Sequence, residues 1–196
     1  SIYVKHAKLL EVVLLVVLGL IFLAQCVLGT FAGQPLEQAF GLSVTAVRRH
    51  EYWRLVTYQF LHVAPMPWHF LFNALGLWFF GRPVLEALGR ARFWQVYGVS
   101  GLAGGLVELA FQAWHPSYFV APTVGASANV LGLAGAYCVI HSGQEIMFFF
   151  YVLPVRLQAM TLFWVLLAFS VFGAVFPYGA TAHAARSKPC GCWRHR

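Results

Sequence analysis

Long apolar stretches separated by short polar ones dominate the chain. A transmembrane helix needs about 20 largely apolar residues, and six segments are candidates: about 9–28, 69–88, 94–113, 126–141, 158–176 and an incomplete one at 179–186. The pattern predicts an all-α fold, a polytopic membrane helix bundle of about six transmembrane helices forming a single domain over residues 1–196. A basic cytoplasmic tail is predicted at 187–196.

The second and fourth segments are less uniformly apolar than a helix that faces lipid. The second contains His69 and Asn73, and the fourth contains Ser127 together with glycines. Lipid cannot satisfy polar side chains, so such residues face the bundle interior or a water-filled cavity. Both segments are therefore predicted to face the interior.

Composition supports a bilayer environment. Of the 196 residues 60% are hydrophobic and 10% are charged, with a mean hydropathy of +0.71, whereas soluble domains have about 25% charged residues. The net charge is +7, but the basic residues stand singly between apolar runs, which argues against nucleic-acid binding. The first apolar run has comparable runs after it, so it is predicted to be a first span rather than a cleaved signal peptide.

The basic residues also indicate orientation, because cytoplasmic loops carry an excess of Lys and Arg. A cytoplasmic N-terminus places ten of them inside, namely Lys5, Lys8, Arg82, Arg90, Arg92, Arg156, Arg186, Lys188, Arg194 and Arg196. It leaves three outside, namely Arg48, Arg49 and Arg54. The second, fourth and sixth segments then all enter from the outer face, so polar residues near their starts lie at similar depth.

Two outer connections and the cysteines complete the layout. Residues 29–68 are aromatic-rich and too long for a plain turn, which favours a functional loop. Residues 114–125 carry no Lys, Arg, Asp or Glu, and they can dip into the membrane if protein or water covers their backbone. No disulfide framework, metal site or redox role is predicted from the four cysteines, Cys26, Cys138, Cys190 and Cys192.

His69 and Asn73 are candidates for stabilising negative charge. They are four residues apart, which places them on one helical face, one turn from each other. Two donors aimed at one point are what a tetrahedral oxyanion requires. The pair alone fits equally well with plain hydrogen bonds between helices.

Ser127 is a candidate nucleophile. It stands among small residues in the segment 125–129, and the helix that follows, to about residue 140, is shorter than the hydrocarbon core, so Ser127 is predicted below the outer surface. Most serines in membrane helices only bond back to the preceding turn. A nucleophilic serine needs a base.

The sequence predicts that this base is a histidine that acts without the aspartate of a Ser-His-Asp triad. The chain contains no Asp, and of its six Glu only Glu108 lies within a span near the outer side, so a Ser-His dyad is expected. His183 follows Ala182 at the outer start of the sixth segment and is the best-placed base. The other histidines besides His69 fall on the cytoplasmic side (His6, His141, His195) or on outer loops (His50, His62, His115).

Four motifs in this order resemble those of the rhomboid intramembrane serine proteases, over about residues 50–185. They are Trp53-Arg54, His69-x-x-x-Asn73, Gly125-x-Ser127 and Ala182-His183. The resemblance implies a Ser127–His183 dyad and an oxyanion site made of His69, Asn73 and the Ser127 N–H. It further implies supporting roles for Trp53, Arg54, Glu86 as the acidic partner of Arg54, and Gly125.

The resemblance also implies partners and location. The expected function is an intramembrane serine endopeptidase that cleaves transmembrane protein substrates in the lipid bilayer, without metal, cofactor or nucleic acid. The expected location is the bacterial inner (plasma) membrane, with multiple passes and a cytoplasmic N-terminus.

Several positions depart from the family pattern. Ala128 replaces the glycine after the serine, Leu131 replaces a tyrosine, and Arg186 stands where a glycine is expected, followed by Lys188 and Pro189. A basic segment of this kind cannot continue a lipid-spanning helix. An inactive rhomboid-like protein that binds membrane helices is therefore the first alternative, and a haem- or ion-handling membrane protein is the second.

Overall fold

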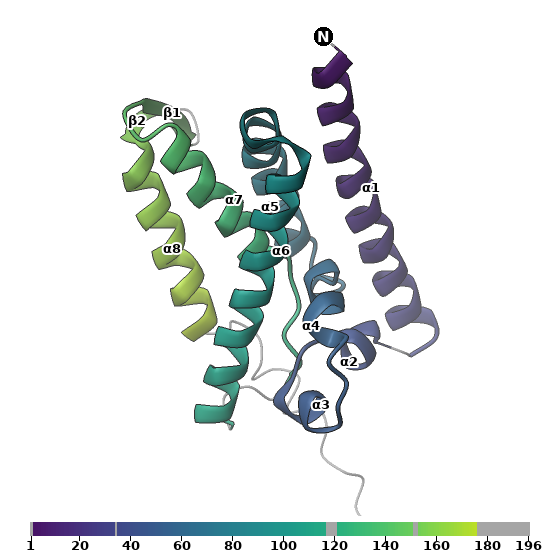
Figure 1. The fold of residues 1–196 in the computed structure, drawn as a ribbon. Coiled ribbons are helices and arrows are strands. Elements are labelled where there is room, and N and C mark those ends of the chain that lie inside the picture. The colour runs from purple at the N-terminus through teal and green to yellow at the C-terminus, as the bar shows by residue number, and fades with distance from the viewer. Residues whose placement is uncertain (1, 34, 117–120, 151–152, 176–196) are drawn as a thin grey trace, which may run out of the picture.

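The computed structural model describes residues 2–33, 35–116, 121–150 and 153–175, most of them helical (Figure 1). In chain order the elements are α1 (Ile2–Phe31), α2 (Leu36–Phe40), α3 (Val44–Arg48), α4 (Arg54–Thr57), η1 (Tyr58–Phe60), α5 (Pro67–Gly76), the π-helical η2 (Leu77–Gly81), α6 (Arg82–Trp114), α7 (Ser127–Ile140), β1 (Glu145–Phe150), β2 (Leu153–Gln158) and α8 (Ala159–Val175). The predicted helical fold class is confirmed.

The long helices lie close to the predicted apolar segments. The segment predicted at 126–141 corresponds to α7, and α1 includes all of 9–28. The segment predicted at 69–88 is built from α5, η2 and the start of α6, and α5 begins two residues earlier because Pro67 occupies its first position, where proline is favoured. Residues 179–196 lie outside the described residues.

A glycine divides α6. Gly89 has φ 80° and ψ 169° inside an otherwise helical run, a conformation open to glycine because it has no Cβ. The chain turns there, so the predicted segments 69–88 and 94–113 are separated at this residue although helical hydrogen bonding continues on both sides.

A two-stranded antiparallel hairpin was not predicted. β1 and β2 pair from Glu145 opposite Gln158 to Phe150 opposite Leu153, in a stretch that the hydropathy pattern assigned to a connection. The stretch is rich in β-branched and aromatic residues, which favour extended backbone.

The core lies where α1, η2, α6, α7 and α8 meet. Its buried members include Leu18 of α1, Phe93 of α6, Leu133 of α7 and Leu162 of α8. Many large apolar side chains remain exposed on the outward faces, such as Leu20 of α1, which is 62% exposed. Such a surface is unusual for a protein in water.

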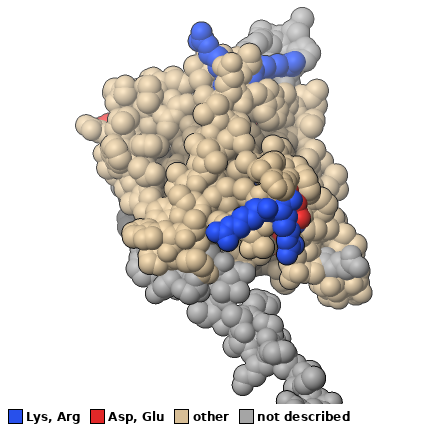
Figure 2. Space-filling model, turned by 60° about the horizontal axis from the view of Figure 1, so that its bottom comes forward, with Lys and Arg blue, Asp and Glu red and all other residues tan. Residues whose placement is uncertain are grey.

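Length and hydropathy single out one described helix as sufficient to cross a bilayer, the part of α1 from Leu9 to Phe31, with a mean hydropathy of 2.8 over its best stretch. Ser127–Ile140 and Ala159–Val171 are shorter apolar helices. On the face that Figure 2 shows, Lys and Arg form small separate groups on a largely uncharged surface, as the scattered basic residues of the sequence indicate.

Candidate active site

Ser127 is the first residue of α7, and Gly125 shapes the turn that leads to it. Gly125 has φ 135°, a value that side chains disfavour, and its N–H donates to the Tyr58 carbonyl oxygen (2.9 Å). The N–H groups of a helix's first turn have no acceptor within the helix. The Ser127 N–H therefore remains free of the α7 ladder and can donate to a ligand.

His69, on α5, is fixed in one tautomer by the chain that precedes it. The Val63 N–H donates to His69 Nδ1 (3.3 Å), so Nδ1 must be the bare nitrogen of a neutral ring. In a neutral imidazole the other nitrogen then carries the hydrogen. His69 Nε2 is thus a hydrogen-bond donor.

His69 and Ser127 meet on either side of Gly125. A Cβ built on Gly125 would lie 2.8 Å from His69 Nε2, 2.7 Å from its Cε1 and 3.8 Å from Ser127 Oγ. The donor nitrogen and the hydroxyl oxygen therefore face the same small space, which exists because residue 125 has no side chain. Two of the residues predicted from sequence are brought together here.

Asn73 lies one turn along α5 from His69 and is 5% exposed. Its Nδ2 donates to the His69 carbonyl oxygen (2.8 Å). An amide nitrogen has two hydrogens, so one remains for a further acceptor. The bond that is present braces the turn that carries His69.

Three polar side chains connect the start of α7, the middle of α6 and η1. Asn129 Nδ2 donates to Gln59 Oε1 (2.7 Å) and to the Tyr97 carbonyl oxygen (2.8 Å). The Tyr58 hydroxyl donates to the Gly101 carbonyl oxygen (2.6 Å). Burial, and secondarily Glu108, raises the pKa of Tyr58 to about 12, so this donor stays protonated.

The methyl group of Ala128, where the family pattern has glycine, points toward α6. A Cβ on Gly104 would overlap the Ala128 Cβ. The glycine that lets α6 and α7 approach closely is thus Gly104 on α6, not residue 128 on α7. Ala128 therefore contacts α6 across Gly104.

Arg54 organises the outer loop, but with another partner than predicted. Its Nη1 donates to the carbonyl oxygens of Gln38 (2.7 Å) and Gly41 (3.0 Å), and its Nη2 forms an ion pair with Glu51.

The expected Arg54–Glu86 pair is wrong. Glu86 instead accepts from Arg82 one turn earlier on its own helix (2.8 Å), a local arrangement that i,i+4 spacing favours. Trp53, next to Arg54, is 55% exposed.

Glu108, the one carboxylate that could have extended the dyad, has a different contact. Thr123 Oγ1 donates to Glu108 Oε1 (2.9 Å), which ties α6 to the loop before Gly125. The predicted base, His183, lies outside the described residues, as does the basic segment after it.

His62 was missed by sequence reasoning, which placed it on an outer loop without a role. Its ring is fully buried and lies against the ring of His69, with centroids 5.4 Å apart. Its spacing of seven residues from His69, with Pro65 and Pro67 between them, is the one sequence feature that indicates a turn bringing them together.

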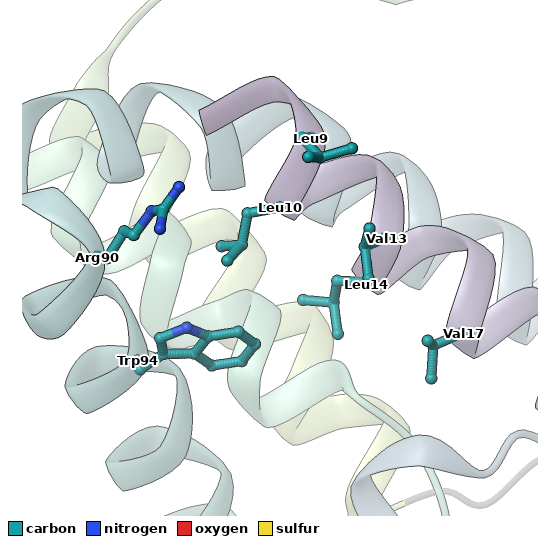
Figure 3. A pocket seen from close by; sticks show the side chains of 7 residues that line it. All are labelled: Leu9, Leu10, Val13, Leu14, Val17, Arg90 and Trp94. Carbon is teal, nitrogen blue, oxygen red and sulfur yellow. The ribbon is translucent and has the colours of Figure 1, made fainter. Parts of the chain in front are cut away.

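Other possible sites on the described residues offer fewer reactive or polar side chains. A groove of about 400 Å³ between α1 and α6 is lined mainly by Leu and Val, with Trp94 and the Arg90 guanidinium at one side (Figure 3). It contains none of the predicted site residues. Among the described residues, no group of three or more His, Cys, Asp or Glu side chains is placed to hold a metal ion.

Comparison with known proteins identifies a family and several relatives. The sequence model of the family described as "Rhomboid domain" matches residues 49–185. The chain is 31% identical to "Rhomboid protein 1, mitochondrial" of Saccharomyces cerevisiae, over 60% of this chain and 34% of that protein. It is 36% identical to "Putative rhomboid protease YdcA" of Bacillus subtilis, over 46% of this chain and 42% of that protein.

A plant protein is similar over a comparable stretch. The chain is 34% identical to "RHOMBOID-like protein 1" of Arabidopsis thaliana, over 56% of this chain and 30% of that protein. The matched stretch thus spans less than half the length of each of these relatives. No solved structure matches the chain significantly.

Proposed function

The chain belongs to the rhomboid family, and we propose that it is an intramembrane serine endopeptidase that cleaves transmembrane protein substrates. Family membership makes it an integral membrane protein with a polytopic helical fold. The proposal adds that Ser127 and His183 form the catalytic dyad.

The observation that carries the proposal is the placement of His69 Nε2 and Ser127 Oγ around Gly125. A hydroxyl that attacks a carbonyl carbon generates an oxyanion next to itself, and donors beside that position stabilise the transition state. A neutral His69 with its hydrogen on Nε2 supplies such a donor. A second comes from the Ser127 N–H at the start of α7.

The reaction follows from these roles. Ser127 Oγ attacks the substrate carbonyl carbon while His183 takes the hydroxyl proton. The oxyanion of the tetrahedral intermediate accepts from His69 Nε2, the Ser127 N–H and the second Asn73 amide hydrogen. The C–N bond then breaks as His183 returns the proton to the leaving amine, and water hydrolyses the acyl-enzyme by the same steps.

Substrates and topology complete the proposal. The spans are α1, α5 with η2, α6, α7, α8 and a short sixth segment at 179–186, with the N-terminus cytoplasmic. Substrates are single-span proteins with a weakened helix near the outer face. The bacterial plasma membrane is the proposed compartment; the similar proteins come from a bacterium, a yeast and a plant.

Covalent labelling tests the proposal. A fluorophosphonate probe should label the detergent-purified protein, and Ser127→Ala and His183→Ala should each abolish labelling, because nucleophile and base are both needed. Labelling of the wild type that persists in Ser127→Ala would reject Ser127 as the nucleophile.

One observation favours an inactive rhomboid-like protein instead. Arg186, Lys188 and Pro189 follow His183 where a membrane helix should continue, so the base has little helix to hold it. A folded wild-type protein that no probe labels, and that still binds transmembrane helices in a pull-down from bilayer nanodiscs, would select this alternative.

A further inference from the structure

The segment 62–64, between η1 and α5, is held by three side chains, two of them from distant parts of the chain. Each of its three consecutive N–H groups donates to a side chain: His62 to Gln25 Oε1 (2.9 Å), Val63 to His69 Nδ1 (3.3 Å) and Ala64 to Glu37 Oε1 (3.3 Å). No helix or sheet ladder includes these groups. The position of the segment therefore depends on the side chains that accept from it.

Gln25 of α1 is the strongest of these anchors. It is fully buried, and besides accepting from the His62 N–H it donates from Nε2 to the His62 carbonyl oxygen (2.6 Å) and to Glu37 Oε1 (2.9 Å). Because one end of a carboxamide accepts and the other donates, only one orientation satisfies both His62 contacts. Gln25 thus fixes the peptide groups on both sides of His62.

The peptide group between His62 and Val63, whose carbonyl oxygen Gln25 binds, also determines which nitrogen of His69 carries the hydrogen. The Val63 N–H, one residue after the clamped His62, donates to Nδ1 and so leaves the hydrogen on Nε2, the nitrogen beside Gly125 and Ser127. If the segment moved away, Nδ1 would lose its donor. The tautomer with hydrogen on Nδ1 would then compete, and it presents a bare nitrogen where an oxyanion needs a donor.

We propose that Gln25 is a positioning residue for the oxyanion site, which keeps the Val63 N–H against His69 Nδ1 and thereby the hydrogen on Nε2. The inference rests on the proposed function for its effect on catalysis. Gln25 lies outside the segment 49–185 that the family model matches, and from sequence it is only a polar residue within the first apolar run.

Gln112 of α6 provides a matched control. It is also buried, at 5% exposure. Its carboxamide also accepts from a backbone N–H, that of Val44 at the start of α3 (3.0 Å), and donates to Thr123 Oγ1 (2.8 Å). Gln25→Leu and Gln112→Leu therefore remove equivalent buried clamps. Only the first lies next to the segment that contacts His69.

The decisive measurement is the tautomer of His69. Long-range ¹H–¹⁵N NMR correlations of ¹⁵N-histidine-labelled protein in detergent distinguish an imidazole with hydrogen on Nε2 from one with hydrogen on Nδ1, and His69→Gln assigns the signal. We expect hydrogen on Nε2 in the wild type and in Gln112→Leu, and a mixture of tautomers in Gln25→Leu. A purely structural role for Gln25 would lower thermal stability in both variants and leave the tautomer unchanged in both.

The rate of fluorophosphonate labelling measures how far the loss of Gln25 weakens the oxyanion site. Loss of a whole oxyanion donor costs a factor of about 10² to 10³, and partial loss of the Nε2 hydrogen should slow labelling by Gln25→Leu roughly tenfold relative to Gln112→Leu. If the wild type is not labelled while the tautomer still shifts in Gln25→Leu, the proposed protease fails and the positioning role of Gln25 stands. Equal labelling rates and equal tautomers in the two variants overturn the positioning role.

A paired substitution covers the case in which Gln25→Leu does not fold. Gln25→Glu keeps the acceptor for the His62 N–H but loses the donor to the His62 carbonyl oxygen and places a second carboxylate beside Glu37, whereas adding Glu37→Gln removes the charge repulsion without replacing that donor. We expect the double variant to fold and still to show a mixture of His69 tautomers, and the wild-type tautomer in this variant would contradict the positioning role. Hydrogen on Nδ1 in the wild type itself would overturn the inference without any variant.

Discussion

The imidazole of His62 packs edge-on against that of His69, with ring centroids 5.4 Å apart and ring planes at 62°. Phe22 and Phe70 enclose His62 on other sides, with centroids 6.3 Å and 5.3 Å away. Neither nitrogen of the buried ring makes a hydrogen bond of ordinary geometry to a described residue. His62 therefore stays neutral in the folded protein over a wide pH range.

We expect stability to fall in acid because of His62. Burial, and secondarily His69, lowers the pKa of His62 from 6.5 to about 4. Between these values the unfolded chain binds a proton that the native state does not, so this contribution is full above about pH 6.5, decreases as pH falls, and levels off near pH 4. The loss is on the order of 3 kcal/mol, because one pKa unit corresponds to about 1.4 kcal/mol.

His62→Phe is the variant that checks this pH dependence. Phenylalanine keeps ring contacts with Phe22 and Phe70 and has no titrating group. In unfolding by SDS from mixed micelles, the variant should lose less stability than the wild type between pH 6.5 and pH 4. Parallel pH profiles for the two proteins would show that His62 does not carry the effect.

Gly125→Ala should abolish labelling and destabilise the fold. A Cβ at this position meets the His69 ring at 2.7 Å and 2.8 Å, and φ 135° is unfavourable for alanine, at a cost of about 1–3 kcal/mol. Gly98→Ala on α6 is the control, because its Cβ meets nothing within 4 Å and alanine favours helix. Equal thermal stability and labelling of the two variants would contradict the geometry around Gly125.

Ala128→Gly should not improve the enzyme although it restores the family pattern. The Ala128 methyl faces Gly104 on α6, so its removal leaves a small gap and lowers stability by about 1 kcal/mol. The labelling rate should stay within about twofold of the wild type.

The reciprocal change tests the same contact. Gly104→Ala should destabilise by about 1–3 kcal/mol through overpacking, and combining it with Ala128→Gly should recover much of that loss. A labelling rate that rises severalfold in Ala128→Gly alone would instead place the methyl in the path of the substrate.

Glu51→Gln should lower the stability of the protein more than Glu86→Gln does. Glu51 pairs with Arg54, which is 9% exposed and holds two loop carbonyls, so neutralising it should cost about 1–3 kcal/mol, the cost of leaving a mostly buried polar group without its partner. Glu86 pairs with Arg82 at the surface, where such a pair contributes about 0.3–0.5 kcal/mol. Thermal unfolding in detergent measures both, and a larger loss for Glu86→Gln would restore the pairing first expected from the motif.

Sequence was sufficient for features that depend on local pattern. Apolar runs located α1, α7 and α8 closely, because helix formation in an apolar environment follows hydropathy and length. The motifs containing His69, Gly125 and Ser127 led to three residues that the fold brings together. The chemistry of those residue types, combined with their order, was informative before any contact was known.

Features that depend on which partner a side chain contacts could not be predicted from the sequence. A charge such as Glu86 can pair within its own helix or across the protein, and the spacing alone does not decide between them. Gln25 and His62 have no periodic pattern around them that distinguishes a buried clamp from an incidental polar residue. The β1–β2 hairpin was missed because an apolar run fits both a strand and a connection.

The hydrogen bonds made by Gln25 show that the stretch recognisable as the family and the stretch that positions its site residues do not begin at the same place. The stretch recognisable as the family begins at residue 49, and all the predicted catalytic residues lie within it. The hydrogen bonds that settle which nitrogen of His69 carries its hydrogen begin 24 residues earlier, on α1. A fragment cut at the edge of the recognisable stretch would keep every signature residue and lose part of what prepares them to react.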